Sequence, residues 1–354
     1  MLGFSIFLNN DLTTETKDYI KSMKVAGFEG IFTSMHIPED DATKYSDRLL
    51  ALGSIAKELN LSLMVDISTK GLSALGLNLN DNPEDIRNLG VTGLRMDYGI
   101  PMETIANVSK VMNVGLNAST LTEREVEELQ GFNADFSNFE LWHNYYPRVE
   151  TGLERSNFIK TNQWLRSLGL KIMTFVPGDG ILRGPLYKHL PCLEEHRYMH
   201  PLAAAIDMFD NCEVDAVYIG DQSIKANTMD QFKEYFQNDL MVLPINVTSY
   251  IHTNLFIGTH TNRVDDARDA VRSQEARFKE FPTIQPDNTV TRSKGSVTLD
   301  NVEYQRYMGE LQITKRDLEQ DPRVNVVATI PTPDVDLVSF IKPGQRFKLI
   351  TEGD

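Results

Sequence analysis

The chain has 354 residues, which at about 150 residues per domain is enough for two domains or for one barrel with an appendage. Its 35 basic and 50 acidic residues give a net charge of −15, which disfavours binding to nucleic-acid backbones and to anionic membrane surfaces. With 41% hydrophobic and 24% charged residues, the chain is expected to fold as a globular protein.

The cysteines and the N-terminal residues bear on the cellular compartment. Cys192 and Cys212 are too few for a disulfide framework or a four-ligand zinc site, which favours a reducing environment. The apolar opening Leu2–Leu8 lacks a basic n-region and does not predict a signal peptide. No run approaches the roughly 18 apolar residues of a membrane span. We therefore expect a cytoplasmic protein.

The first 240 residues alternate short apolar runs with amphipathic helical stretches. Strands are expected at Leu2–Leu8, Gly30–Ser34, Ser62–Ile67, Gly93–Asp97, Val114–Ala118, Asn138–Trp142, Lys171–Val176 and Ala216–Gly220. Eight such units predict a closed (β/α)8 TIM barrel. An open doubly wound sheet is the alternative, but Phe7-Leu8-Asn9-Asn10 stands where that fold has its glycine-rich turn.

After Leu240 the pattern changes to short Val/Thr/Ile-rich pieces divided by Pro, Gly and Asn. Strands are expected at Val290–Thr298, Gly309–Thr314, Val324–Ile330 and Arg346–Ile350, with one helical patch at Asp265–Lys279. This pattern predicts a small antiparallel β-domain. We place the boundary near Met241, which gives domains 1–240 and 241–354. The second domain has 14 basic and 16 acidic residues, so most of the negative charge lies on the barrel.

Barrel enzymes build their sites at the carboxyl ends of the strands, and polar residues end several strands here. Asp66, Asp97, Asn117 and Asp221 each fit a helix cap or a loop hydrogen bond when taken alone. Their convergence on one rim favours a functional site. Asp66 and Asp97 would lie roughly 5 to 7 Å apart on neighbouring strands. That separation suits a carboxylate pair at a glycosidic bond.

The connection after the seventh strand is far longer than an ordinary βα loop. Phosphate sites of barrels are often made by the loops after strands seven and eight, and Arg183 and Arg197 stand in this one. We expect them to bind phosphate; the alternative is that they pair with neighbouring loop carboxylates and order the loop. His189, His196 and His200 share no regular element, so no metal site is expected.

Several long stretches of the chain are similar to one bacterial family. They are Ile31–Asp40, Leu94–Gly99, Asn117–Thr120, His143–Arg148, Thr151–Leu153, Arg183–Leu186, Asp300–Asn301 with Tyr304, and Arg306–Glu310. Members of this family were formerly known as outer surface proteins or as uncharacterised proteins. Its characterised members are 6-phospho-N-acetylmuramidases. The resemblance extends over nearly the whole chain.

This resemblance implies a TIM-barrel glycosidase-like domain followed by a small cyclophilin-like β-barrel. It also implies hydrolysis of the disaccharide N-acetylmuramic acid 6-phosphate–N-acetylglucosamine during cell-wall recycling in the cytosol. No cofactor is expected, the expected partner is this phosphorylated disaccharide, and a homo-oligomer is left open.

The expected catalytic residues are Asp97 and Asp66, with Glu194 third. Substrate contacts are expected from His36, Asn117, His143, Asn144, Tyr146, Arg183, Arg197, Asp221, Arg306 and Glu310. Of these, the second domain's Arg306 and Glu310 would close over the site, and a purely structural role for the two is left open.

Two other classes of function remain as alternatives. A metal-assisted barrel enzyme, a phosphosugar isomerase or phosphoester hydrolase, would use Asp66, Asp97, Asp221 and a histidine as ligands. Enzyme activity that survives exhaustive chelation of metal ions would exclude this alternative. A non-enzymatic surface protein follows from the family's older name but conflicts with the opening sequence. Finding the intact chain outside unlysed cells would favour it.

Overall fold

The computed structural model describes residues 1–35, 44–67, 79, 83–96, 99–250, 252–277 and 282–351. Its contacts divide the chain into two compact units, Met1–Met229 and Asp230–Asp354. No described helix is both long enough and apolar enough to cross a lipid bilayer.

The first unit is a closed barrel of eight parallel strands in which β1 pairs with both β2 and β8. The strands are β1 Leu2–Ser5, β2 Gly30–Ser34, β3 Ser62–Ile67, β4 Gly93–Met96, β5 Asn113–Asn117, β6 Phe139–Trp142, β7 Lys171–Val176 and β8 Ala216–Ile219. The predicted barrel is confirmed.

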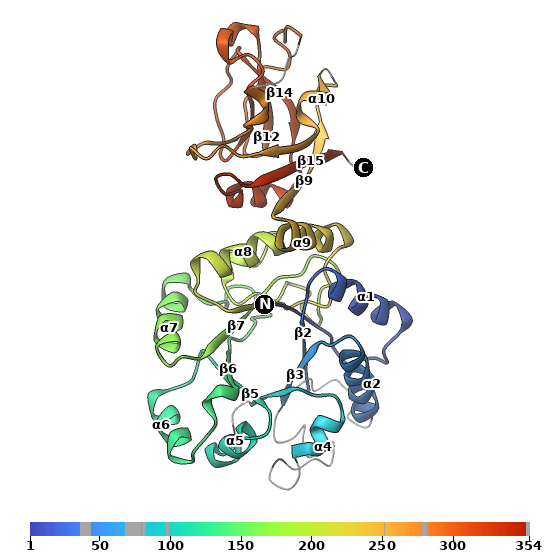
Figure 1. Cartoon of the computed structure of the whole chain (residues 1–354), viewed down its shortest axis with the longest axis vertical. Helices are drawn as coiled ribbons and strands as arrows, with labels where there is room; N and C mark the ends of the chain where they lie inside the picture. Colours follow the sequence, from blue (N-terminus) through green and yellow to red (C-terminus); the bar gives the residue numbers. More distant parts are fainter. Residues whose placement is uncertain are drawn as a thin grey trace. The chain divides into compact units, whose positions relative to one another are not determined.

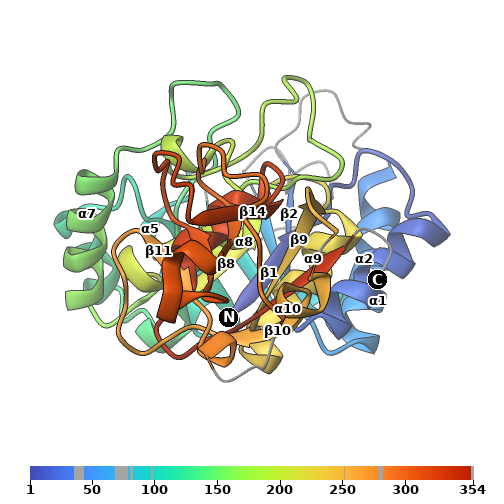
Figure 2. The same ribbon diagram turned by 90° about the horizontal axis from the view of Figure 1, so that it is seen from above.

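Helices surround these strands, as the ring in Figure 1 and the outer positions of α1, α2 and α7 in Figure 2 show. They are α1 Thr14–Val25, α2 Tyr45–Glu58, α4 Pro83–Asn88, α5 Met102–Ser109, α6 Glu123–Gly131, α7 Arg155–Ser167, α8 Pro201–Asn211 and α9 Ala226–Asn238. Local sequence sets their starts. Thr122 and Glu125 form a capping box at α6, and Glu154 accepts two backbone N–H groups at the start of α7.

The barrel interior is filled by large aromatic side chains that face glycines. Phe32, Trp142, Phe175 and Tyr218 contact one another with ring centroids 4.6 to 6.1 Å apart. A Cβ at Gly3 would lie 2.1 Å from the Tyr218 ring, so only glycine fits there. This layer closes the barrel beneath the carboxyl ends of the strands.

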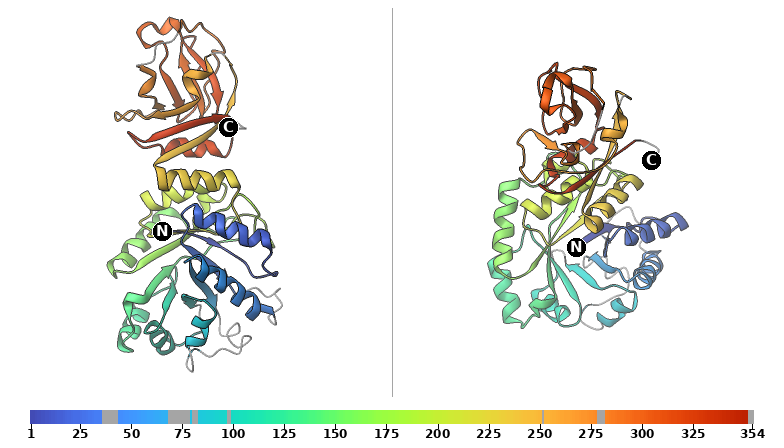
Figure 3. Two further views of the ribbon diagram at one scale, coloured as in Figure 1. Left: turned by 45° about the vertical axis from the view of Figure 1, so that its right-hand side comes forward. Right: turned by 45° about the horizontal axis from the view of Figure 1, so that its top comes forward.

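The second unit is a seven-stranded sheet in the order β10-β15-β9-β14-β12-β13-β11, which Figure 3 shows from two sides. Its strands are β9 Leu240–Val247, β10 Gly258–Thr261, β11 Ala270–Arg272, β12 Ser296–Asp300, β13 Leu311–Thr314, β14 Val324–Thr329 and β15 Arg346–Thr351, with the short helix α10 at Thr253–Phe256. The sheet is mixed, because β15 runs parallel to β9. The predicted small antiparallel β-domain is therefore a mixed sheet, in which the β15–β9 pair is parallel and the other strand pairs are antiparallel.

The predicted helical patch at Asp265–Lys279 is also wrong. The segment contains the strand β11 and a 3-10 turn at Glu275–Arg277. Ala270 and Val271 are buried, and β11 pairs antiparallel with β13. Sheet pairing therefore overrides a local helical pattern at this position.

Candidate active site

A cavity of about 840 Å³ lies in the first unit, lined by residues that follow the carboxyl ends of the barrel strands. Its lining includes Phe7, Asn9, Asn10, Phe32, Ser34, Asp66, Arg95, His143, Asn144, Tyr145, Tyr146, Phe175, Arg183, Tyr187 and Gln222. Among the described lining residues, Asp66 is the one carboxylate and Arg95 and Arg183 are the cations. This part of an acidic protein therefore has a local positive excess.

Aromatic rings form one wall of the cavity. Phe32, Tyr145 and Phe175 line it, and the Tyr145 ring meets the other two edge-on at centroid distances of 6.3 and 5.2 Å. The Arg183 guanidinium lies 3.7 Å from the centroid of the Phe7 ring. Flat apolar faces next to fixed charges suit a sugar ring that carries an anionic group.

Asp66 stands near the end of β3, and its side chain is 12% exposed. Arg95 Nη1 donates to its Oδ1 at 2.8 Å, and Ser34 Oγ donates to its Oδ2 at 3.2 Å. The sequence predicted Asp66 as a catalytic carboxylate, and the structure places it on the cavity wall. Its predicted partner Asp97 and the predicted contact His36 lie outside the described residues.

Arg95 is a residue of this site that sequence analysis did not single out. It lies on β4 with only 6% of its side chain exposed, between Asp66 and Asn144, whose Oδ1 accepts a hydrogen bond from Arg95 Nη2. A charged residue inside an otherwise apolar parallel strand was the signal that could have found it, because such strands are buried on both faces.

His143 lines the cavity but has no free nitrogen. Its Nε2 bonds to Asn162 Oδ1 at 2.7 Å and its Nδ1 to Ser119 Oγ at 3.1 Å. Burial lowers the pKa of His143 to about 4, so the ring is neutral at pH 7. His143 therefore orders the wall of the cavity, and neighbouring Tyr146, predicted as a substrate contact, also lines it.

The long segment after β7 is held by Asp221, which is 1% exposed. Its carboxylate accepts the backbone N–H groups of Gly178, Arg183 and Leu190 at 2.9 to 3.1 Å. A Cβ at Gly178 would lie 2.8 Å from that of Asp221, so the loop packs against it closely. Both oxygens of Asp221 therefore hold the loop, and its predicted role in substrate binding stays a prediction.

Arg197 and Glu194 organise the same segment. Arg197 donates to both Glu194 oxygens and to the carbonyl oxygens of Lys188, His189 and Arg148, which uses all five of its N–H donors. Its side chain is 1% exposed. Arg197 therefore holds the loop in this structure, and its predicted binding of phosphate stays a prediction.

Glu194 is fully occupied as well. Its oxygens accept the backbone N–H groups of Glu150 and Gly152 at 2.8 and 2.7 Å, in addition to the pair with Arg197. The hydrogen bond from Arg197 and these backbone bonds lower the pKa of Glu194 to about 2. Glu194 is not among the described lining residues of the cavity, and its predicted catalytic role stays a prediction.

Arg183 differs from Arg197 in its free donors. Its Nη1 donates to the Tyr145 hydroxyl at 2.6 Å, while its Nε and Nη2 have no partner among the described residues. The side chain is half-buried and lines the cavity. The predicted anion contact of Arg183 stays a prediction.

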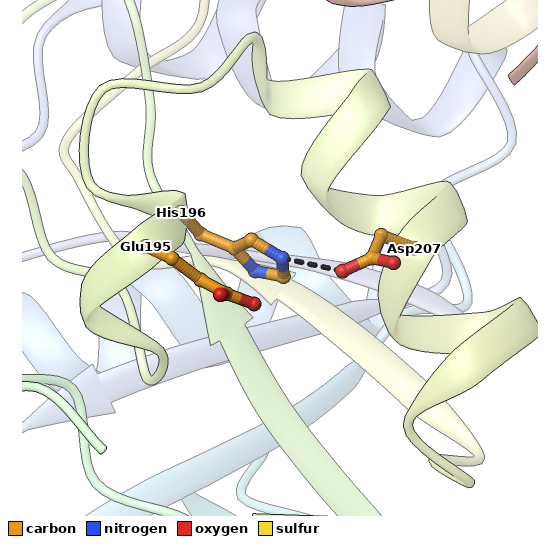
Figure 4. Close-up of side chains that lie close together, drawn as sticks. All are labelled: Glu195, His196 and Asp207. Carbon is orange, nitrogen blue, oxygen red and sulfur yellow. Dashed lines mark hydrogen bonds and ion pairs between the residues drawn. The ribbon is translucent and has the colours of Figure 1, made fainter. Parts of the chain in front are cut away.

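A cluster of Glu195, His196 and Asp207 is the group of possible metal ligands that the described residues bring together. Figure 4 shows the His196 ring directed at Asp207, with Nε2 2.6 Å from the carboxylate. Arg155 pairs with both carboxylates. Because a guanidinium already pairs with both carboxylates, the cluster joins α7 to α8 as a structural network.

The remaining predicted contacts are not among the described lining residues of the cavity. Asn117 accepts the Ser119 N–H at 3.0 Å in a loop turn. In the second unit Glu310 is buried and pairs with Arg272, while Arg306 donates to the Tyr307 hydroxyl. Their predicted part in substrate binding stays a prediction.

Family models describe nearly the entire chain. The model for the N-terminal part of 6-phospho-N-acetylmuramidase matches residues 2–234, and the model for its C-terminal part matches residues 240–350. The chain belongs to the 6-phospho-N-acetylmuramidase family. This membership makes it a glycosidase, as the sequence predicted, and the cavity at the strand ends is the candidate active site of that glycosidase.

Solved structures show the same architecture for this glycosidase chain. A conserved Enterococcus faecalis protein of unknown function is 47% identical, with a TM-score of 0.91 over 100% of this chain and 97% of its own. An uncharacterised B. cereus protein is 22% identical, with a TM-score of 0.71 over 99% of both chains, and supports the fold alone. No curated protein matches the chain.

Proposed function

We propose that the protein hydrolyses the glycosidic bond of N-acetylmuramic acid 6-phosphate–N-acetylglucosamine in cell-wall recycling. The observation that carries the proposal is the cavity itself, where Asp66 and the half-free Arg183 line one space with an aromatic wall. A carboxylate serves the bond to be cleaved, a guanidinium binds an anion, and the rings contact the sugar.

Asp66 and Asp97 form the proposed catalytic pair. One carboxyl protonates the leaving oxygen, and the other stabilises or attacks the anomeric carbon. Asp66 takes the role of the carboxylate that stabilises or attacks the anomeric carbon, because both of its oxygens accept a hydrogen bond, one from Arg95 and one from Ser34. Asp97 takes the role of acid. No cofactor enters this reaction.

Arg183 is the proposed phosphate contact. Its Nε and Nη2 are adjacent donors of one planar group, the geometry that binds two oxygens of a phosphate together. The chain carries a net charge of −15, so a phosphorylated lactyl-sugar is repelled at long range and needs a local cation. The stacking of the guanidinium on Phe7 fixes the direction of these donors.

The proposal also covers the cellular compartment, the fold of the second unit and the oligomeric state. The protein acts in the cytosol, the second unit is a cyclophilin-like β-barrel, and a homo-oligomer is compatible with the proposal. They are supported by the family resemblance and by the charge and cysteine content.

The metal-assisted alternative finds no support in the described residues. Asp66 is paired with Arg95, and Asp221 accepts three backbone N–H groups, so neither carboxylate is presented to a common centre. The alternative of a non-enzymatic surface protein is not retained, because the chain belongs to an enzyme family.

The test is hydrolysis of the phosphorylated disaccharide by the wild-type protein and by Asp66→Asn and Asp97→Asn. Each substitution preserves size, and each should lower kcat by at least about 10²-fold, the scale for loss of a catalytic carboxyl. Asp18→Asn, at an exposed position of α1, is the matched control and should keep normal turnover. Near-normal turnover in both Asp66→Asn and Asp97→Asn would contradict the proposed pair.

A further inference from the structure

We propose that Arg95 is the positioning residue of this site, because one guanidinium fixes both the carboxylate of Asp66 and the amide of Asn144. The inference rests on the proposed function. It assigns to Asn144 a defined chemical role, as a hydrogen-bond donor to an acceptor oxygen of the bound sugar.

The first step concerns the direction of the Asn144 amide. An asparagine side chain has a carbonyl end that accepts and an NH2 end that donates, and the two ends have almost the same shape. A guanidinium has five donors and no acceptor. Since Arg95 Nη2 contacts the Asn144 side chain, the carbonyl end must face Arg95 and the NH2 end must point away.

The second step concerns the free end. Asn144 lines the cavity, and its NH2 group has no partner within the described part of the chain. The backbone of Asn144 is fixed too, because its carbonyl oxygen accepts a hydrogen bond from the buried Cys192 thiol at 2.9 Å. The amide is thus held at both its backbone and its carbonyl end, which leaves two donors for a ligand.

The third step is the coupling of this donor to Asp66. Arg95 Nη1 bonds to Asp66 Oδ1 while Nη2 bonds to Asn144, and the guanidinium is planar and rigid. The acceptor carboxylate and the amide donor therefore keep a fixed spacing. A lysine has a single charged nitrogen and cannot hold both partners in this geometry.

The test uses steady-state kinetics on the phosphorylated disaccharide. Asn144→Asp keeps the bond to Arg95 but offers the substrate an oxygen in place of an NH2 group. We expect kcat/KM to fall by about 10- to 100-fold, and by more than in Asn144→Ala, where the donor is only removed. If Asn144→Asp is as active as wild type, or more active than Asn144→Ala, the assigned donor role is wrong.

Arg95→Lys tests the coupling. It should raise KM and lower kcat together, each by about tenfold or more, and the double variant Arg95→Lys/Asn144→Ala should have no higher KM than Arg95→Lys alone. Added guanidinium ion should restore part of the activity of Arg95→Ala. Arg124→Lys, at an exposed position of α6, is the control for loss of a guanidinium.

A merely structural role for Arg95 predicts different results. The effects on KM would then multiply in the double variant, and guanidinium would restore nothing; either result overturns the inference while wild-type turnover upholds the proposed function. Absence of wild-type turnover on this disaccharide would contradict the proposed function, and the inference with it.

Discussion

Arg183 and Arg197 stand in the same long segment after β7, only 14 positions apart, yet the structure uses them in opposite ways. Arg197 is buried and spends every donor on Glu194 and on three carbonyl oxygens. Arg183 is half-buried at the cavity, and its Nε and Nη2 have no partner among the described residues. The difference shows that two arginines of one loop can differ in how many of their donors the described residues already occupy.

The same distinction separates the carboxylates of the rim. Asp221 and Glu194 bind backbone N–H groups and shape the loop, whereas Asp66 faces the cavity from a pair with Arg95. The site is therefore built in two parts. One set of charged residues holds the backbone, and a second set lines the cavity.

The largest expected effect is the loss of stability in Arg197→Met. Removal of the guanidinium leaves Glu194 and three carbonyl oxygens without their donor, which should lower the free energy of unfolding by about 3 to 5 kcal/mol. Urea denaturation measures it. Arg183→Met is the control from the same loop and should change the free energy by less than about 1 kcal/mol. Equal losses of unfolding free energy in the two variants would contradict the different roles of Arg183 and Arg197.

His143 lines the cavity, but its two ring nitrogens are bonded to Asn162 and Ser119 and so hold the wall of the cavity. Its pKa is lowered to about 4 in the folded protein, against 6.5 unperturbed, so the unfolded chain binds more protons between these pH values. Stability should therefore fall as the pH drops from 6.5 to 4, by about 3 kcal/mol in all.

Denaturation curves at pH 7.5 and 4.5 test this expectation. His143→Gln is expected to be less stable at pH 7.5, because its bonds to Asn162 and Ser119 are disturbed, but to lack this part of the acid sensitivity. If wild type and variant lose stability in parallel over this range, His143 does not carry the effect.

Glu194→Gln separates a loop carboxylate from a catalytic one. We expect kcat on the phosphorylated disaccharide to stay within about threefold of wild type. The free energy of unfolding should fall by about 1 to 2 kcal/mol, because a neutral amide accepts the N–H groups of Glu150 and Gly152 less strongly. A kcat decrease of about 10²-fold without loss of stability would show that Glu194 is a catalytic residue.

The barrel was predictable because its signal is local and repeated. Each of the eight strands is a short apolar run, and their number alone indicates closure. The segment Asp265–Lys279 was not predictable in this way, since β11 exists only through its pairing with β13, about 40 residues later in the chain. The parallel pairing of β15 with β9 spans about a hundred residues and has no local pattern at all.

The candidate site was predictable in its place but not in its roles. Asp66, His143, Asn144, Tyr146 and Arg183 do line the cavity, because chemistry in a barrel gathers at the strand ends. Sequence does not show which charges are already paired. The N–H groups that occupy Asp221 come from residues 31 to 43 positions away, and only the folded loop brings them together.

The smallest expected effect is also the most selective. Arg183→Lys keeps the positive charge but loses the planar pair of donors, so kcat/KM on the phosphorylated disaccharide should fall by about tenfold, equivalent to about 1.4 kcal/mol. Activity on the unphosphorylated disaccharide should barely change, because that substrate offers no phosphate to Nε and Nη2. The free energy of unfolding should stay within about 0.5 kcal/mol of wild type, since Nε and Nη2 have no partner among the described residues. Equal losses on both substrates would show that Arg183 holds the loop through Tyr145 and Phe7, as Arg197 does through Glu194, and the contrast between the two arginines would fail.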